Sequence, residues 1–188
     1  MKKTVVSSLA LVAALASSQA FAFGVTDNAL DLGVTSRDSE TGFVIGGEGR
    51  PESDVGLAFE GAYQSEEIAG FDRTRLRVGA GVGTHYGASI DQYGALIAGF
   101  VADDVDFIDD SGFYVQARYE AKLLDTAALG TNVTYYDVWD GGLTAELYVR
   151  YQLTTDLAVQ ASYTLDIDDV DGGDDALMIG LRYSPDWL

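Results

Sequence analysis

Apolar and polar residues alternate along most of this chain, which is the period of a β-strand. In residues 143–153, Leu, Ala, Val and Tyr occupy every odd position, while the even positions are mostly polar and include Glu146 and Arg150. The same alternation, interrupted by short polar or glycine-rich breaks, predicts strands rather than amphipathic helices. We expect strands at residues 28–35, 41–49, 55–63, 75–86, 93–101, 113–121, 143–153, 157–167 and 176–183.

A tenth strand is predicted at Thr131–Trp139, which is followed by the hairpin-turn sequence Asp140-Gly141-Gly142. Counting it gives the even number of strands that single-chain bacterial barrels have, with both chain ends on one side of a membrane. The chain length of 188 residues also suits eight strands, with the first hairpin or residues 122–142 outside the wall. We expect ten strands, with eight as the alternative.

Two all-β architectures share this pattern: a secreted sandwich and a closed antiparallel transmembrane β-barrel. The barrel is favoured by strand lengths that suffice to cross hydrocarbon at a tilt. Six arginines and six acids fall on polar strand faces, so a narrow lumen could pair them. The apolar faces repeatedly end in a tyrosine, as in an interfacial aromatic girdle. These tyrosines are Tyr63, Tyr86, Tyr119, Tyr151 and Tyr183.

Residues 1–22 have the pattern of a secretory signal peptide. Two lysines follow Met1, an apolar run extends from Val5 to Ala16, and Ala20-Phe21-Ala22 forms a cleavage site. The apolar run is too short for a transmembrane helix. We therefore expect residues 23–188 to be a single exported barrel domain in the bacterial outer membrane.

Composition excludes several functional classes. The chain has no Cys and one His, which excludes zinc fingers, iron–sulfur sites, thiol catalysis and disulfide scaffolds. The formal net charge of −19, without a basic stretch, argues against nucleic acid as a partner. We expect no cofactor and no bound metal.

With ten strands, the connections alternate between the two ends of the barrel. One end has the connections 36–40, 64–70, 102–110, 140–142 and 168–174, which hold 14 Asp and Glu residues. The other end has 50–53, 87–92, 122–130 and 154–156, with only four. Because the outer loops of such barrels are normally the longer ones, the acidic end is predicted to be extracellular.

The chain resembles small outer-membrane β-barrel proteins of the OmpX and OmpA-transmembrane type. The glycine-rich segment 75–83 and the closing segment Ile179-Gly-Leu-Arg-Tyr183 also resemble the YfaZ-type family. The resemblance implies a monomer surrounded by outer-membrane lipid and lipopolysaccharide. It also implies periplasmic chaperones and the barrel-assembly machinery as partners. Unlike barrels that finish on an aromatic residue, this chain continues past Tyr183 with Ser184-Pro-Asp-Trp-Leu188.

Charged lumen positions are the main candidate site. They are Arg73, Arg75, Arg77, Arg118, Glu120, Glu146, Arg150 and Arg182. They could line a narrow pore for ions or small solutes, or form a salt-bridged plug that only stabilises the barrel. The plug is favoured in a barrel of eight strands, and ten strands would narrow that preference. Glycines at inward positions leave space, which favours a pore. Those glycines are Gly56, Gly79, Gly81, Gly83 and Gly180.

Two further candidates lie outside that set. A lipid-modifying enzyme would have to use His85, with Ser89 nearby, but strand parity places His85 in the lumen and away from lipid. The acidic runs Asp103–Asp110 and Asp166–Asp175 are interpreted as solvated loops, with cation binding between them and lipopolysaccharide phosphates as the alternative. We expect a non-enzymatic structural or surface-interaction protein that acts through acidic extracellular loops. A pore is the alternative, and an enzyme the distant one.

Overall fold

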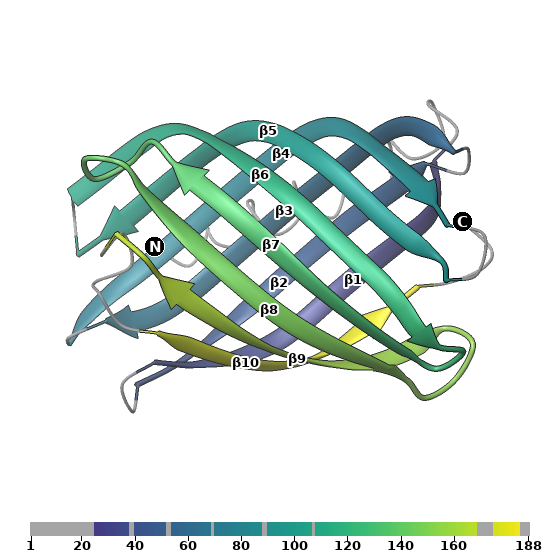
Figure 1. The fold of residues 1–188 in the computed structure, drawn as a ribbon. Helices are drawn as coiled ribbons and strands as arrows, with labels where there is room; N and C mark the ends of the chain where they lie inside the picture. Colours follow the sequence, from purple (N-terminus) through teal and green to yellow (C-terminus); the bar gives the residue numbers. More distant parts are fainter. Residues whose placement is uncertain are drawn as a thin grey trace.

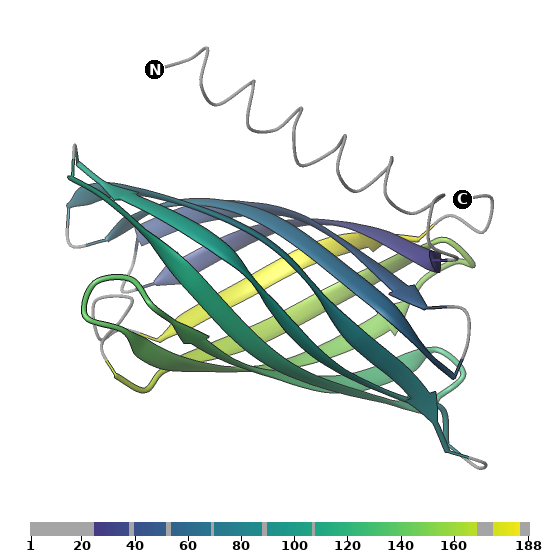
Figure 2. The same ribbon diagram turned by 90° about the horizontal axis from the view of Figure 1, so that it is seen from above.

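The computed structural model describes residues 25–184, except 38–39, 52–53, 69, 88–89, 107 and 169–174. The predicted signal peptide, residues 1–22, lies outside this range. The described part forms a closed barrel of antiparallel strands (Figures 1 and 2). Its ten strands are β1 (Val25–Arg37), β2 (Glu40–Pro51), β3 (Val55–Ile68), β4 (Phe71–Tyr86), β5 (Gln92–Val105), β6 (Ile108–Leu124), β7 (Ala127–Tyr136), β8 (Gly142–Gln152), β9 (Leu157–Asp166) and β10 (Ala176–Tyr183).

The barrel closes where the first strand pairs with the last. β1 and β10 run antiparallel from Leu30 opposite Tyr183 to Arg37 opposite Ala176. Every other strand pairs with its neighbours in sequence, so the described wall has no open edge. The predicted closed antiparallel barrel and the preferred count of ten strands are therefore confirmed, and the eight-strand alternative is wrong.

Two ends of the barrel are distinguished by their turns. The end with turns 38–39, 69–70, 106–107, 137–141 and 167–175 is called the acidic end here. The opposite end has turns 52–54, 87–91, 125–126 and 153–156 and is called the terminal end, because the described chain begins and finishes there. Strands at both ends extend further than the sequence pattern predicts. The connection predicted at 102–110 is reduced to residues 106–107, and the one at 122–130 to residues 125–126.

The strands are longer than predicted because the lumen provides ion-pair partners for charged side chains that point inward. Asp103 has the appearance of a loop residue because it lies in a dense acidic run. In the barrel it points inward, where two arginines pair with it, so the ladder continues past it. Asp103–Asp110 is thus two strand ends joined by a short turn, and the interpretation of this run as a loop is wrong, although Asp104, Asp106 and Asp109 are exposed. Residues 169–174 of the second acidic run lie outside the described residues.

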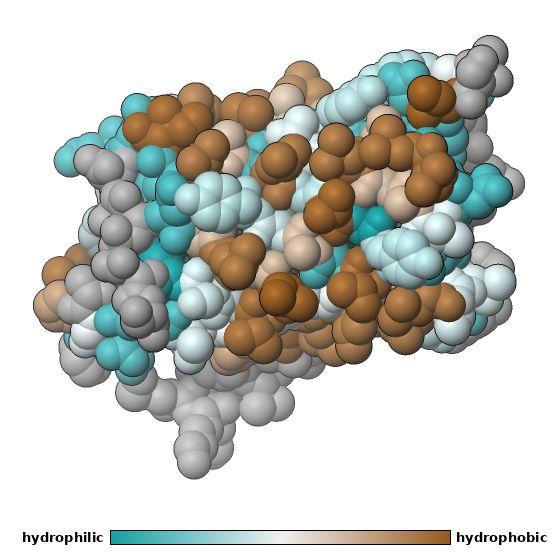
Figure 3. Space-filling view, turned by 60° about the horizontal axis from the view of Figure 1, so that its bottom comes forward, coloured by the Kyte–Doolittle hydropathy of each residue, from teal (hydrophilic) through white to brown (hydrophobic). Residues whose placement is uncertain are grey.

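Large apolar patches cover much of the wall on the face that Figure 3 shows. Leu, Ile, Val and aromatic side chains remain exposed on it, for example Leu32, Leu96 and Ile179 at 57%, 61% and 59%. Exposed aromatics lie toward both ends. Those toward the acidic end are Phe43, Phe71, Phe100, Phe113, Tyr135 and Tyr163, and those toward the terminal end are Tyr86, Tyr119, Tyr151 and Tyr183. Two aromatic belts flanking an apolar band match the surface of a membrane-spanning barrel.

One predicted member of the girdle differs. Tyr63 is only 6% exposed, although it lies on an outward position of β3 and contacts Phe43, with 5.9 Å between the ring centroids. Among the described residues, no helix has the length and apolar character needed to cross a membrane.

The turn between β7 and β8 folds inward over the acidic end. The sequence predicts a strand as far as Trp139, but β7 ends at Tyr136 and residues 137–141 form the turn. Trp139 and Asp140 have φ angles of 53° and 73°, in the left-handed region that non-glycine residues rarely adopt. The Trp139 backbone N–H donates to the Asp110 carboxylate at 2.7 Å. The turn inserts Val138, only 2% exposed, into the barrel interior.

Inward glycines are covered by inward tyrosines. A Cβ atom on Gly79 would lie 2.2 Å from the Tyr114 hydroxyl oxygen, and one on Gly130 would lie 2.1 Å from the Tyr148 ring. Tyr93 covers Gly83 in the same way. The expectation that Gly79 and Gly83 leave open space for a pore is therefore wrong, because tyrosine rings from neighbouring strands fill that space.

Candidate functional site in the barrel lumen

All eight charged residues singled out from the sequence lie on lumen-facing positions. Arg73, Arg75 and Arg182 are 4%, 6% and 5% exposed, so these guanidinium groups are enclosed. Arg37 and Arg50 are also buried and face the lumen, which places every arginine of the chain there. The lumen is therefore the charged interior of the protein. Its charged contacts form three layers along the axis, with an apolar layer between the first and the middle one.

The first layer lies near the acidic end and centres on Asp103, which is 2% exposed. Its carboxylate accepts hydrogen bonds from Arg73 and from Arg75, the latter at 2.8 Å from Nη2. Arg37 lies 3.8 Å from Glu66 close to the same end. Because both partners in these pairs are enclosed, removing a single carboxylate would leave an uncompensated buried charge.

Beneath these pairs is a packed apolar layer. Tyr114, Ile97 and Val101 are between 0% and 1% exposed, and Tyr136 and Val138 complete the cluster. Charged groups border it: the Arg75 guanidinium lies 4.5 Å from the centroid of the Tyr136 ring, and Arg77 donates to the Tyr136 hydroxyl at 2.8 Å. We call this layer the plug. It fills the lumen in the half of the barrel nearer the acidic end.

The middle layer is an ion-pair network around Glu48. Its carboxylate accepts from Arg118, from Arg182 and from Arg50, the last at 2.8 Å. Arg118 also donates to Glu60 at 2.6 Å, which ties β6 to β3 across the lumen. Glu146, in contrast, accepts from the neutral side chain of Asn132 at 2.7 Å. A cavity of about 100 Å³ lies among these groups.

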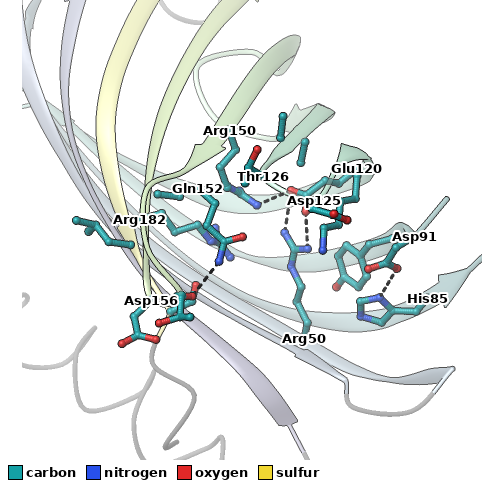
Figure 4. Close-up of a pocket in the computed structure, with 18 residues that line it drawn as sticks. Arg50, His85, Asp91, Glu120, Asp125, Thr126, Arg150, Gln152, Asp156 and Arg182 are labelled. Atoms are coloured by element: carbon teal, nitrogen blue, oxygen red, sulfur yellow. Dashed lines mark hydrogen bonds and ion pairs between the residues drawn. The ribbon is translucent and has the colours of Figure 1, made fainter.

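The third layer centres on Glu120, toward the terminal end. Arg50 donates to both of its oxygens, at 2.8 and 3.1 Å, and Arg150 donates to it at 2.6 Å. The Tyr148 hydroxyl donates a further hydrogen bond at 2.8 Å. Figure 4 shows Arg50, Glu120 and Arg150 among the residues that line a larger cavity.

That larger cavity has a volume of about 410 Å³ and is called the cup here. Side chains and backbone from turns 87–91, 125–126 and 153–156 line its mouth, so it opens at the terminal end. The Glu120 and Glu48 networks form its inner limit, and beyond them lies the plug. Among the described residues, the lumen thus has a cavity that opens at the terminal end and a layer of enclosed side chains nearer the acidic end.

Strand parity missed four lumen residues that pair there: Arg37, Arg50, Glu66 and Asp103. Each was assigned to a predicted connection or its border, because the breaks in the apolar pattern come before the strands end. Continuing the alternation of the neighbouring strand, for example Asp103 after Val101, would have placed them inward. Positive and negative side chains are still paired in the lumen, as predicted, but the paired residues are partly different from the predicted ones.

His85 lies at the mouth of the cup and not among the buried pairs. Its Nδ1 is 3.6 Å from the Asp91 carboxylate, and its ring lies 4.9 Å from that of Tyr93. Ser89, the nucleophile that an enzyme would need, lies outside the described residues. Within the described ranges, no group of three or more His, Cys, Asp or Glu side chains could hold a metal ion.

The rim of the acidic end is strongly negative. Its exposed acids are Glu67, Asp72, Asp104, Asp106, Asp109, Asp137, Asp140, Asp168 and Asp175. The cations at this end, Arg37, Arg73 and Arg75, are all buried in the lumen, so no exposed Lys or Arg balances the rim among the described residues. Most of these acids lie on strand ends and tight turns, and not in the long loops that the sequence suggested.

Comparisons with solved structures find outer-membrane barrels of low similarity. A KdgM porin has 11% identity and a TM-score of 0.48, covering 84% of this chain and 99% of its own. Outer membrane phospholipase A from Escherichia coli has 13% identity and a TM-score of 0.48, covering 86% and 93%. Acinetobacter baumannii Omp33 has 9% identity and a TM-score of 0.43, covering 86% and 99%.

No protein-family model matches the chain, and no curated protein is significantly similar to it. The resemblance to outer-membrane β-barrels is confirmed at the level of the closed ten-stranded architecture, and membership of the YfaZ-type family is not. With TM-scores below 0.5, these likenesses carry no inference about function, which has to come from the barrel itself.

Proposed function

We propose that this chain is an outer-membrane barrel with a closed lumen, and that its role is structural or surface-interacting, carried out by the acidic rim. The closed lumen is the observation that carries the proposal. Tyr114 and Val101 are fully enclosed, and the Asp103 ion pairs lie above them. Moving an ion through this layer would require breaking buried pairs and displacing packed side chains, both of which are costly.

The wall and the rim support the location and the role. The apolar band between two aromatic belts fits hydrocarbon flanked by interfacial headgroups. The exposed acids and enclosed arginines at one end give that end a single sign of charge, which favours basic partners and bridging cations. The short turns and both described chain ends lie opposite, as they do on the periplasmic side of such barrels. The acidic rim would thus be extracellular.

Single-channel recording in a planar bilayer tests the closed lumen. The refolded protein should produce no steady openings, with folding verified independently by β-rich circular dichroism. A variant with the plug reduced, Tyr114→Ala together with Val138→Gly, should conduct more than the parent, because both changes remove side chains from the filled layer. Steady openings of the unaltered protein, with selectivity that changes when Arg73, Arg75 and Arg77 are substituted, would overturn the closed-lumen proposal.

A narrow pore is the second candidate, and one observation favours it. The two cavities, of about 100 and 410 Å³, are both lined by Arg150 and Arg182, so only side chains separate them. Such a pore would still need the plug to move. An enzyme that modifies lipid with His85 is the more distant candidate. Replacing His85 should abolish any lipid-modifying activity if this residue carries it, and activity that survives the replacement would exclude this candidate.

A further inference from the structure

The charged side chains that line the cup differ between its inner end and its mouth. Its inner wall carries three arginines, Arg50, Arg150 and Arg182, and one carboxylate, Glu120. Glu48 and Asp31, just outside the lining, pair with Arg50 and Arg182. Lys122 also lines the cup, nearer its mouth, where its backbone N–H donates to the Asp91 carbonyl oxygen. The mouth carries three aspartates from the terminal-end turns, Asp91, Asp125 and Asp156. Figure 4 shows Asp156 on one side and the His85–Asp91 pair on the other, with Arg50, Glu120 and Arg150 between them. The cavity is therefore lined by arginines that carboxylates compensate at its inner end, and by the three aspartates at its entrance.

Two cationic side chains of the cup have N–H donors that are not bonded to a carboxylate of the described residues. Arg150 donates its Nε and Nη2 protons to the neutral amide oxygen of Gln160, at 3.2 and 2.9 Å. An incoming carboxylate could replace that amide with charge-assisted bonds, which are roughly twice as strong as bonds between neutral groups. Lys122 lines the cup and is exposed, and it makes no ion pair within the described part of the chain. These two side chains form the anionic subsite.

The mouth offers the opposite chemistry. Asp125 and Asp156 line the cup and form no ion pair with any described residue, and Asp91 pairs only with His85, a cation only when it is protonated. An ammonium group held there would be attracted to two or three carboxylates. A polyanion would have to pass these same carboxylates to reach the arginines, so the entrance selects against it.

We propose that the cup binds a small zwitterion from the terminal end of the barrel, with its carboxylate at Lys122 and Arg150 and its ammonium group at Asp125 and Asp156. The ligand class is an ω-amino acid or a similarly sized solute with separated opposite charges. The cavity of about 410 Å³ is large enough for such a molecule, and its closed inner end makes it a binding site and not a passage. This inference does not depend on the role of the acidic rim.

Three matched probes distinguish this site from a simple ion site: 4-aminobutyrate, butyrate and butylamine. Titration of each into the folded full chain, in micelles at low ionic strength, should give the tightest binding for 4-aminobutyrate, by about tenfold over either singly charged probe, as one added charged hydrogen bond would provide. β-Alanine and 6-aminohexanoate extend the test to shorter and longer spacings between the charges.

Variants at each subsite complete the experiment. Lys122→Gln should weaken 4-aminobutyrate and butyrate alike, whereas Asp125→Asn with Asp156→Asn should weaken 4-aminobutyrate and butylamine. Asp104→Asn, an exposed change at the opposite end, is the control and should alter none of them. Equal affinities for butyrate and 4-aminobutyrate would overturn the zwitterion site. So would a failure of all three ω-amino acids to bind a protein whose folding has been verified by gel mobility.

Discussion

At the residue scale, this barrel depends on pairing almost every charge that it encloses. Glu48 alone accepts from three arginines on three strands, and Glu120 accepts from two. Tyrosine rings covering glycines occupy the remaining inward surface, as Tyr148 does over Gly130. Apart from the Arg50–Glu48 bond within β2, these contacts join different strands, so a single inward substitution should affect the wall as a whole.

Asp103 offers the sharpest test at this scale. Asp103→Asn keeps the shape of the side chain but removes the charge that Arg73 and Arg75 share, and it should lower the free energy of unfolding by about 3–5 kcal/mol. Denaturant unfolding in lipid or detergent, followed by circular dichroism, measures the loss. Asp109→Asn is the matched control, because this carboxylate at the same end of the barrel is exposed. An equal loss in both variants would contradict the buried-pair account.

At the scale of elements, the period of two was sufficient to predict the strands and the inward positions of residues such as Arg118 and Arg150. It could not predict where each strand ends. Asp103 and Arg50 lie beyond the last apolar residue of a clear run, and only the opposite wall of the barrel supplies the partner that keeps them in the ladder. The apolar pattern also did not predict that Val138 points into the barrel interior, because this position depends on a turn in which the next two residues adopt left-handed backbone angles.

The β7–β8 turn can be tested through Trp139. Asp110→Ala removes the acceptor of the Trp139 backbone N–H and should cost about 1 kcal/mol locally, loosening the turn over the plug. Trp187, the only other tryptophan of the chain, is replaced by Phe so that fluorescence reports Trp139 alone. Acrylamide should then quench the Asp110→Ala protein more strongly than the parent. Asp109→Ala, one position away and exposed, should leave quenching unchanged; similar quenching in all three proteins would show that Asp110 does not hold the turn.

At the scale of the whole molecule, closure is the dominant property. All ten strands pair on both sides, and the lumen contributes cross-barrel ion pairs in place of an apolar core running its full length. Unfolding cannot begin at an open edge of the described wall, because none is present there. The molecule should therefore resist denaturants until the wall opens cooperatively.

Gel mobility tests that cooperativity. The unboiled protein should remain a compact barrel in dodecyl sulfate and migrate faster than the boiled chain, since its backbone groups are already paired within the wall. Comparing samples heated in small steps should show two bands that exchange intensity, without intermediates. One band of constant mobility before and after boiling would contradict a closed barrel.

The seam between β1 and β10 brings the two ends of the described chain to neighbouring positions at the terminal end. A short peptide could therefore join them, and new ends could be opened at a turn of the acidic end, such as residues 69–70, without changing a single strand pair. The order in which the strands are synthesised would then differ while the finished wall stayed the same. Such circular permutants would separate what the wall needs in order to be stable from what the cell needs in order to build it.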